Sequence, residues 1–395
     1  MKRTLSLPTL SMALLLLLLL ALLLGSGGCI KRYRTAPALE FAQLPYRSLD
    51  GKTWPHKSIR AKAVAKRYKM KRAPRVVYVE LNPSGGQTLV FIHGLGSYLK
   101  FWRYQLDTFA AKGYRVIALD LPGYGKSDKP ASFPYTMEAM ADVVRELLVQ
   151  LGIRKPVLIG HSMGGQTALS YAIRYPREPR AVVLTSPAGF ETFSKREQLW
   201  FAKVLSVRLI EDTPEYAIWG GVRRNNFYRW KPDYEWLIEE RTRLKKAKQF
   251  EQYAYANVKS VTGLARNDFV RESAKKIVAP TLIVYGEKDR LIPNPFMHGG
   301  FTRTVMRSGA KKIRGSKLVG LARCGHTVQM DCHDEYNAAV TAYLAQVAPP
   351  IAKAPAPVPA PAPPRRAPTS QPVPASRPAS QASPTSQPAS QPTTR

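Results

Sequence analysis

The sequence predicts an α/β fold built on a mostly parallel sheet, which we place in residues 76–347 with an interruption at 191–276. Apolar runs of strand length recur in this region, and several of them end in a turn that contains glycine. One run leads through such a turn directly into helix-favouring sequence, as the strands of a parallel sheet require. Two later runs are separated by about ninety residues, far more than an ordinary connection needs.

Residues 1–28 are predicted to be an export signal. This segment has a basic start at Lys2 and Arg3 and an almost continuous run of leucine over residues 12–24. The run is shorter than the roughly 20 residues of a membrane-spanning helix, which favours a signal, and an uncleaved anchor is the alternative.

The end of the export signal resembles a bacterial lipobox, because small residues precede Cys29. This resemblance implies that Cys29 is lipidated, becomes the new N-terminus and anchors the protein in the bacterial cell envelope, facing the periplasm or the surface. Ser26 stands three residues before Cys29, where the lipobox usually has leucine. Cleavage nearby by a general signal peptidase is the alternative.

Residues 29–75 form a basic segment with few acidic residues, and the whole chain has a formal net charge of +33. Such a charge raises the question of nucleic acid, but the sequence contains no recognition module. We therefore expect no nucleic-acid partner. Attraction to an anionic membrane surface or another envelope polyanion is the hypothesis, and a solvated basic surface is the alternative.

The apolar run Val90–Ile92 predicts a buried strand, which ends in a turn at residues 93–96. This turn contains glycine and can present a backbone N–H group to developing negative charge, and Leu95 is the predicted donor. We interpret His93 as a structural residue of the turn.

The next run begins at residue 116 and ends in the glycine turn that contains Gly125, Lys126 and Ser127. These three residues invite comparison with a phosphate-binding loop. That pattern requires glycine where this chain has Asp120, so we reject nucleotide binding.

Residues 156–174 predict a strand, a sharp turn and a helix in that order. The turn carries Ser162 between Gly160 and Gly164, the arrangement of a nucleophile elbow, in which neighbouring Cβ atoms would collide. Ser162 is therefore the candidate nucleophile, and the N–H of Met163 is the second predicted oxyanion donor. His161 is expected to pack beneath the turn, since consecutive residues on it point apart.

Two later strands supply the partners that a serine nucleophile needs. The run at residues 281–285 is followed by Asp289, and the run at 318–321 leads to His326. An acid at a strand end can orient an imidazole, which in turn can take the proton of the serine. Alternatives remain open for both: for the acid Glu287, Asp331 and Asp334, and for the base His298 and His333.

The interruption at residues 191–276 is predicted to be a helical cap that follows the sixth strand. Residues 197–210 and 234–250 have helical spacing. Its aromatic side chains suggest an apolar roof over Ser162, or else they fasten the cap to the core. These residues are Trp200, Phe201, Trp219, Phe227, Tyr228, Trp230 and Trp236.

Residues 348–395 consist mainly of proline, alanine, serine, glutamine and threonine and are expected to be disordered. Cys324 and Cys332 remain as possible partners in an exported chain. Sequence separation gives no distance between them, so pairing and two buried thiols both stay open.

Taken with the order Ser162, Asp289, His326, these motifs make the chain from about residue 76 to 344 resemble the α/β-hydrolase superfamily. The resemblance is strongest to its capped esterase, lipase and carbon-carbon hydrolase branch. It implies a mostly parallel central sheet with helices on both faces and a cap after the sixth strand. Branches that open epoxides or haloalkanes carry aspartate in place of Ser162.

These residues favour a serine hydrolase that cleaves a carboxylic ester or related acyl bond through an acyl-enzyme, without metal or cofactor. The expected substrate is a small, partly apolar ester. A carbon-carbon bond hydrolase of the same fold is the nearest alternative. A binding or scaffold protein that kept the fold is the alternative from another class.

Overall fold

The computed structural model describes Tyr33 and residues 35–350, so the expectations for residues 1–28, Cys29 and the tail from 351 lie outside the described part. The described residues form an eight-stranded sheet in the order β1-β2-β4-β3-β5-β6-β7-β8. The strands are β1 His56–Arg60, β2 Arg75–Leu81, β3 Thr88–Ile92, β4 Arg115–Leu119, β5 Val157–His161, β6 Ala181–Thr185, β7 Thr281–Gly286 and β8 Lys317–Leu321.

The sheet is mostly parallel, as predicted. All pairings from β4 through β8 are parallel, whereas β2 pairs antiparallel with both β1 and β4. Because parallel neighbours point the same way, the carboxyl ends of β3, β5, β7 and β8 lie along one edge.

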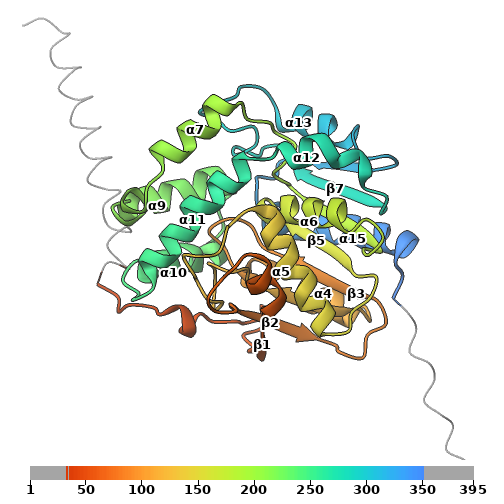
Figure 1. Cartoon of the computed structure of the whole chain (residues 1–395), viewed down its shortest axis with the longest axis horizontal. Helices are drawn as coiled ribbons and strands as arrows, with labels where there is room; N and C mark the ends of the chain where they lie inside the picture. The colour runs from red at the N-terminus through yellow and green to blue at the C-terminus, as the bar shows by residue number, and fades with distance from the viewer. Residues whose placement is uncertain (1–32, 34, 351–395) are drawn as a thin grey trace, which may run out of the picture. The chain divides into compact units, whose positions relative to one another are not determined.

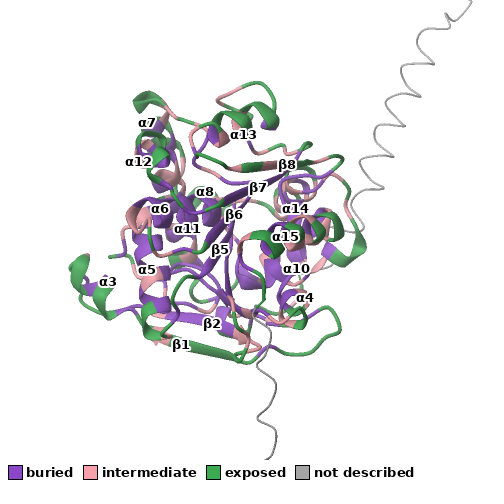
Figure 2. Ribbon diagram, turned by 90° about the vertical axis from the view of Figure 1, so that its right-hand side faces the viewer, coloured by how far each residue is buried: buried purple, intermediate pink, exposed green. Residues whose placement is uncertain are grey.

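Helices cover both faces of the sheet, which is why its central strands are apolar on both sides. Val90 and Ile92 of β3 join one core with α5 and α6, and Leu89 and Phe91 join the other with α4 and α15. Figure 2 shows these buried strands between the two helix layers. The core helices are α3 Lys62–Arg67, α4 Leu106–Ala111, α5 Met137–Gln150, α6 Met163–Arg174, α13 Thr302–Ala310, α14 Val328–Asp331 and α15 His333–Val347, with short turns η1 Phe41–Gln43 and η2 Leu99–Trp102.

The basic segment is part of this fold. Its strand β1 forms the edge of the sheet, and its side chains Tyr46 and Trp54 are buried in the core. The Trp54 indole N–H donates to the Asp107 carboxylate at 3.1 Å. Residues 35–75 are therefore folded at the edge of the sheet, and their basic side chains lie on the surface of this folded segment.

The cap lies between β6 and β7, where the sequence places it, and its helices α7, α9, α10 and α11 lie together in Figure 1. Its elements are α7 Lys195–Val204, α8 Val207–Glu211, α9 Glu215–Gly221, the π-helical turn η3 Val222–Asn226, η4 Pro232–Tyr234, α10 Trp236–Leu244, α11 Phe250–Ala265, α12 Asp268–Ser273 and η5 Ala274–Lys276.

The two long cap helices expected from the spacing are each broken. Leu205 is extended and the Ser206 side chain accepts from the Leu209 N–H, which starts a new helix at α8. Between α10 and α11 the Lys248 N–H donates to the Glu40 carboxylate instead of to a helical carbonyl. Across the described residues, no helix has the length and apolarity needed to cross a bilayer.

Candidate active site

Ser162 occupies the sharp turn between β5 and α6. Its backbone has φ 52° and ψ −112°, in the region with positive φ that side chains other than glycine rarely adopt. A Cβ atom on Gly160 would lie 2.2 Å from the Gly164 carbonyl oxygen, and one on Gly164 would lie 2.2 Å from the Ile92 carbonyl oxygen. Gly160 is therefore required for the turn to close on itself, and Gly164 is required for it to pack against β3.

His326 and Asp289 meet at the ends of β8 and β7. Imidazole Nδ1 lies 2.7 Å from Asp289 Oδ2, and both side chains are almost fully buried. The other carboxylate oxygen accepts from the backbone N–H groups of Leu291 and Ile292 at 2.8 and 3.1 Å. Because the carboxylate accepts, Nδ1 carries the proton and Nε2 is the basic atom of the ring.

Ser162 and His326 line the same cavity, of about 290 Å³. The cavity is otherwise walled by residues of the core, the cap and the loop after β7, including Leu95, Phe201 and Ile292. The structure thus brings the serine, the histidine and, through its hydrogen bond, the aspartate to one end of the sheet.

The turn after β3 passes directly beside Ser162. A Cβ atom on Gly94 would lie 3.3 Å from the Ser162 Cβ, and Leu95 lines the cavity. Within the described residues, neither the Leu95 N–H nor the Met163 N–H donates to a protein group. Both donors therefore remain available to a substrate oxygen, which is what an oxyanion hole requires.

His93 holds this turn in place. The Leu121 N–H donates to His93 Nε2 at 3.1 Å, so the Nδ1 carries the proton and donates to the Gly94 carbonyl at 2.8 Å. Burial lowers the pKa of His93 to about 4, which keeps the ring neutral. His93 therefore acts as a structural residue of the turn, as we interpreted it from the sequence.

Comparison with known proteins agrees with this fold. Residues 87–331 match the family model described as alpha/beta hydrolase fold. The chain belongs to the α/β-hydrolase family.

Relatives of this hydrolase carry names of different activities. It is 29% identical to the 2-hydroxy-6-oxononadienedioate/2-hydroxy-6-oxononatrienedioate hydrolase of Escherichia coli K12, over 66% of this chain and 88% of the relative. It is 30% identical to lipase 1 of Psychrobacter immobilis, over 55% of this chain and 67% of the relative. Among solved structures, a probable hydrolytic enzyme from Pseudomonas aeruginosa PAO1 has a TM-score of 0.67 at 24% identity, covering 77% of this chain and 97% of that one, and supports the fold alone.

The histidine and acid alternatives are engaged in other contacts, although His298 contacts Glu191, which itself lines the Ser162 cavity of the hydrolase. His298 is bound between Glu191 and Glu197, at 2.5 and 3.1 Å. His333 stacks on the Tyr104 ring at 4.4 Å. Among the described residues that line the cavity, none of the competing candidates is present. They are Glu287, His298, Asp331, His333 and Asp334.

His161 is buried beside His326 and lines the same cavity as Ser162, although the sequence placed it beneath the turn. Its Nε2 lies 3.2 Å from the His326 backbone carbonyl, to which it donates, and the two rings are 4.9 Å apart. Burial lowers the pKa of His161 well below its ordinary value, so it is a neutral support for the His326 loop.

The His326 loop is closed by a disulfide bond between Cys324 and Cys332, which resolves the question that the sequence left open. Asp331, inside this loop, accepts from the backbone N–H groups of Gly325 and Tyr228, both at 2.7 Å. Covalent and hydrogen-bonded restraints therefore fix the segment that carries the imidazole.

The expectation that the cap aromatics form a roof over Ser162 is mostly wrong. Of the seven cap aromatics, Phe201 alone lines the Ser162 cavity among the described residues. Trp236 packs edge-on against Phe101 and beneath the Lys100 ammonium, and Phe227 stacks on Tyr234 at 4.4 Å. Trp236 therefore fastens the cap to the core, whereas Phe227 and Trp230 pack with Tyr234 inside the cap, where rings bury their apolar area against one another.

Sequence reasoning missed two cap residues that reach the oxyanion turn. Arg241 Nη2 donates to the Gly96 carbonyl at 3.3 Å, and the Tyr253 hydroxyl donates to the same oxygen at 3.1 Å. Neither belongs to a motif, and the chain separates them from Gly96 by 145 and 157 positions. No local signal could have identified them.

Proposed function

We propose that this protein is a serine hydrolase that cleaves a carboxylic ester through an acyl-enzyme. Ser162 is the nucleophile, His326 the general base and Asp289 the residue that orients the imidazole. The proposal rests on the Asp289–His326 hydrogen bond of 2.7 Å. His326 lines the same cavity as Ser162, which lies on its constrained turn.

The reaction follows from these positions. His326 Nε2 takes the hydroxyl proton while Ser162 Oγ attacks the ester carbonyl, and the carbonyl oxygen becomes negative. The Leu95 and Met163 N–H groups donate to that oxygen, each contributing on the order of 10²- to 10³-fold. The imidazolium then returns its proton to the departing alkoxide, and water repeats the sequence on the acyl-enzyme. This scheme needs no metal or cofactor.

Turnover of a short activated ester tests the proposal. Ser162→Ala should abolish hydrolysis of p-nitrophenyl butyrate, because no other group supplies the nucleophile. Ser170→Ala is the matched control, since Ser170 is a fully buried serine further along α6. Full activity of Ser162→Ala would remove Ser162 from its proposed role.

A carbon-carbon bond hydrolase is the second candidate, and the Escherichia coli relative favours it. The same three residues would serve, with a vinylogous ketone in place of the ester. Parallel assays with p-nitrophenyl esters and with ring-cleavage products separate the two, because the proposed ester hydrolase turns over the first class faster.

We propose that the protein is exported and anchored in the cell envelope through a lipidated Cys29. The support is the sequence of residues 1–29, together with a disulfide bond that an oxidising compartment would preserve. Intact-mass analysis of the membrane fraction tests it. A mature chain that starts elsewhere, or lacks diacylglycerol, would contradict lipidation.

A further inference from the structure

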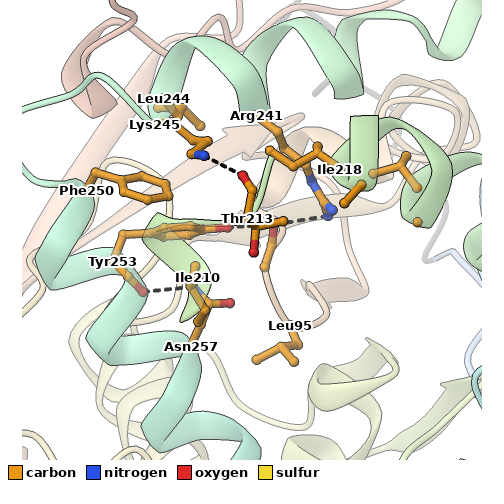
Figure 3. A pocket seen from close by; sticks show the side chains of 14 residues that line it. Leu95, Ile210, Thr213, Ile218, Arg241, Leu244, Lys245, Phe250, Tyr253 and Asn257 are labelled. Atoms are coloured by element: carbon orange, nitrogen blue, oxygen red, sulfur yellow. Dashed lines mark hydrogen bonds between the residues drawn. The ribbon is translucent and has the colours of Figure 1, made fainter. Parts of the chain in front are cut away.

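The cap holds a second cavity, of about 350 Å³, next to the one that contains Ser162 (Figure 3). It lies among α8, α9, α10 and α11. Six apolar side chains of the cap line it: Ile210, Ala217, Ile218, Val222, Leu244 and Phe250. The two cavities have only Leu95 and Arg241 in common among their described lining residues. We call the second cavity the cap chamber.

Several polar groups of the cap chamber have partners within the protein, and the Arg241 guanidinium, which also lines it, donates through Nη2 to the Gly96 carbonyl. Lys245 Nζ donates to the Thr213 carbonyl, and Asn257 Nδ2 donates to the Tyr253 carbonyl at 2.8 Å. The Tyr253 hydroxyl is held by Gly96, as described above. No acidic residue is among the described residues that line the chamber. Its interior is therefore suited to hydrocarbon, because apolar groups gain from leaving water and polar ligand groups would find few free partners.

The position of the chamber selects which half of an ester could enter it. The leaving alcohol must lie beside His326, because that ring donates the proton to it. His326 lines the Ser162 cavity and not the chamber. The chamber instead begins at Leu95, whose N–H is proposed to bind the carbonyl oxygen. Leu95 and Arg241 line both cavities, so an acyl chain that runs away from His326 past these two side chains is directed toward the chamber.

We infer that the cap chamber binds the acyl chain of the substrate, and that the protein prefers esters of extended fatty acids over acetate or butyrate. This inference rests on the proposed ester hydrolysis at Ser162. Each cavity alone has about the volume of the smallest ligand sites, and the two together accommodate a longer ligand.

Gly221 gives a direct test because it lines the chamber on α9. A Cβ atom added there meets no atom within 4 Å, and its backbone is helical at φ −64°, so Gly221→Phe fills space without backbone strain. The assay is kcat/KM for p-nitrophenyl esters from acetate to dodecanoate. We expect Gly221→Phe to lower kcat/KM for dodecanoate at least roughly tenfold, equivalent to losing about two buried methylenes, with acetate nearly unchanged.

Tyr216→Trp is the matched control, since Tyr216 lies on the same helix with 64% of its surface exposed and does not line the chamber. Phe250→Leu is the complementary variant, which enlarges the chamber and should raise the preferred chain length. Equal effects of Gly221→Phe on acetate and dodecanoate, or no effect on either, would overturn the inference. Ser162→Ala tests the proposed function separately from the acyl-chain inference, because it should remove activity toward esters of all chain lengths.

Discussion

The carbonyl oxygen of Gly96 joins the cap to the turn that carries the Leu95 N–H. It accepts from Arg241 and Tyr253, two donors on different cap helices. An oxyanion donor is effective only when its position is fixed before the charge develops. If Leu95 is an oxyanion donor as proposed, we expect Tyr253 to act as a positioning residue, and its hydroxyl can be removed without changing the ring.

Tyr253→Phe should lower kcat for p-nitrophenyl butyrate by roughly 3- to 10-fold with KM changed by less than about twofold, as expected for loss of one hydrogen bond that positions the donor. Steady-state kinetics measure both constants. Tyr255→Phe is the control, because Tyr255 lies on the same helix and donates to the Ala131 carbonyl. An unchanged kcat in Tyr253→Phe would separate the Gly96 contact from catalysis.

His93 should make stability depend on pH. Its pKa of about 4 in the folded protein lies below the roughly 6.5 of an unfolded histidine, so the unfolded state binds more protons between these values. Its contribution is therefore complete above about pH 6.5 and declines as the pH falls toward 4.

The His93→Gln variant keeps a donor and an acceptor but cannot titrate. Between about pH 7.5 and 5, we expect its unfolding free energy to fall by about 2 kcal/mol less than that of the unmodified protein. Urea unfolding at a series of pH values measures this difference. Equal pH dependence in both proteins would show that His93 does not titrate on unfolding.

Much of the site could be predicted residue by residue, because each of Ser162, Asp289 and His326 follows its own apolar strand. Local sequence identifies such strand ends, and parallel pairing brings them to one edge. Arg241 and Tyr253 could not be predicted, since only the docking of the cap brings them to Gly96.

At the scale of elements, a buried ionic cluster fastens α10 to η2. Lys100 Nζ and the Tyr98 hydroxyl donate to the two carboxylate oxygens of Glu240 at 2.7 and 2.6 Å. The Lys100 and Glu240 side chains are only 7% and 8% exposed. Removing one partner would leave a charge buried without compensation, which costs more than the pair itself contributes.

Glu240→Gln should therefore lower the unfolding free energy by about 3 kcal/mol. Glu239→Gln is the control on the same helix, because Glu239 is 38% exposed and its pair with Arg243 contributes about 0.5 kcal/mol or less. Urea unfolding of both variants gives the comparison. If the two variants are equally stable, the cluster does not hold the cap.

The elements that were missed or given wrong bounds from the sequence are those decided by distant contacts. Strand β1 has an almost fully exposed burial pattern and shows no apolar alternation, so nothing local distinguishes it from the rest of the basic segment. It is ordered by its pairing with β2. The cap helices break where a serine cap or a contact to Glu40 competes with helical spacing.

At the scale of the whole molecule, the net charge of +33 bears on whether the protein is attracted to a membrane surface. We expect the chain from residue 29 onward with Cys29→Ser, which lacks the leucine run and cannot be lipidated there, to sediment with anionic vesicles at low salt and to be released at high salt. Vesicles of zwitterionic lipid are the control. Binding that ignores both salt and lipid charge would contradict electrostatic attraction to the membrane.

The overall architecture could be predicted because it depends on the order of apolar runs and on one long interruption. The distances within the site could not, since the sheet, the disulfide between Cys324 and Cys332 and the docked cap set them together. The cap chamber likewise could not be predicted from the sequence. Its walls come from α8 through α11, and no single segment reveals its volume.

Mapping the site of covalent labelling by a fluorophosphonate tests the central claim most directly. The reagent captures a serine activated by its neighbouring base. Peptide mass spectrometry should find one equivalent of adduct on the peptide that contains Ser162, with labelling strongly slowed in His326→Ala. An adduct on another residue, or labelling that proceeds at the same rate without His326, would contradict the account.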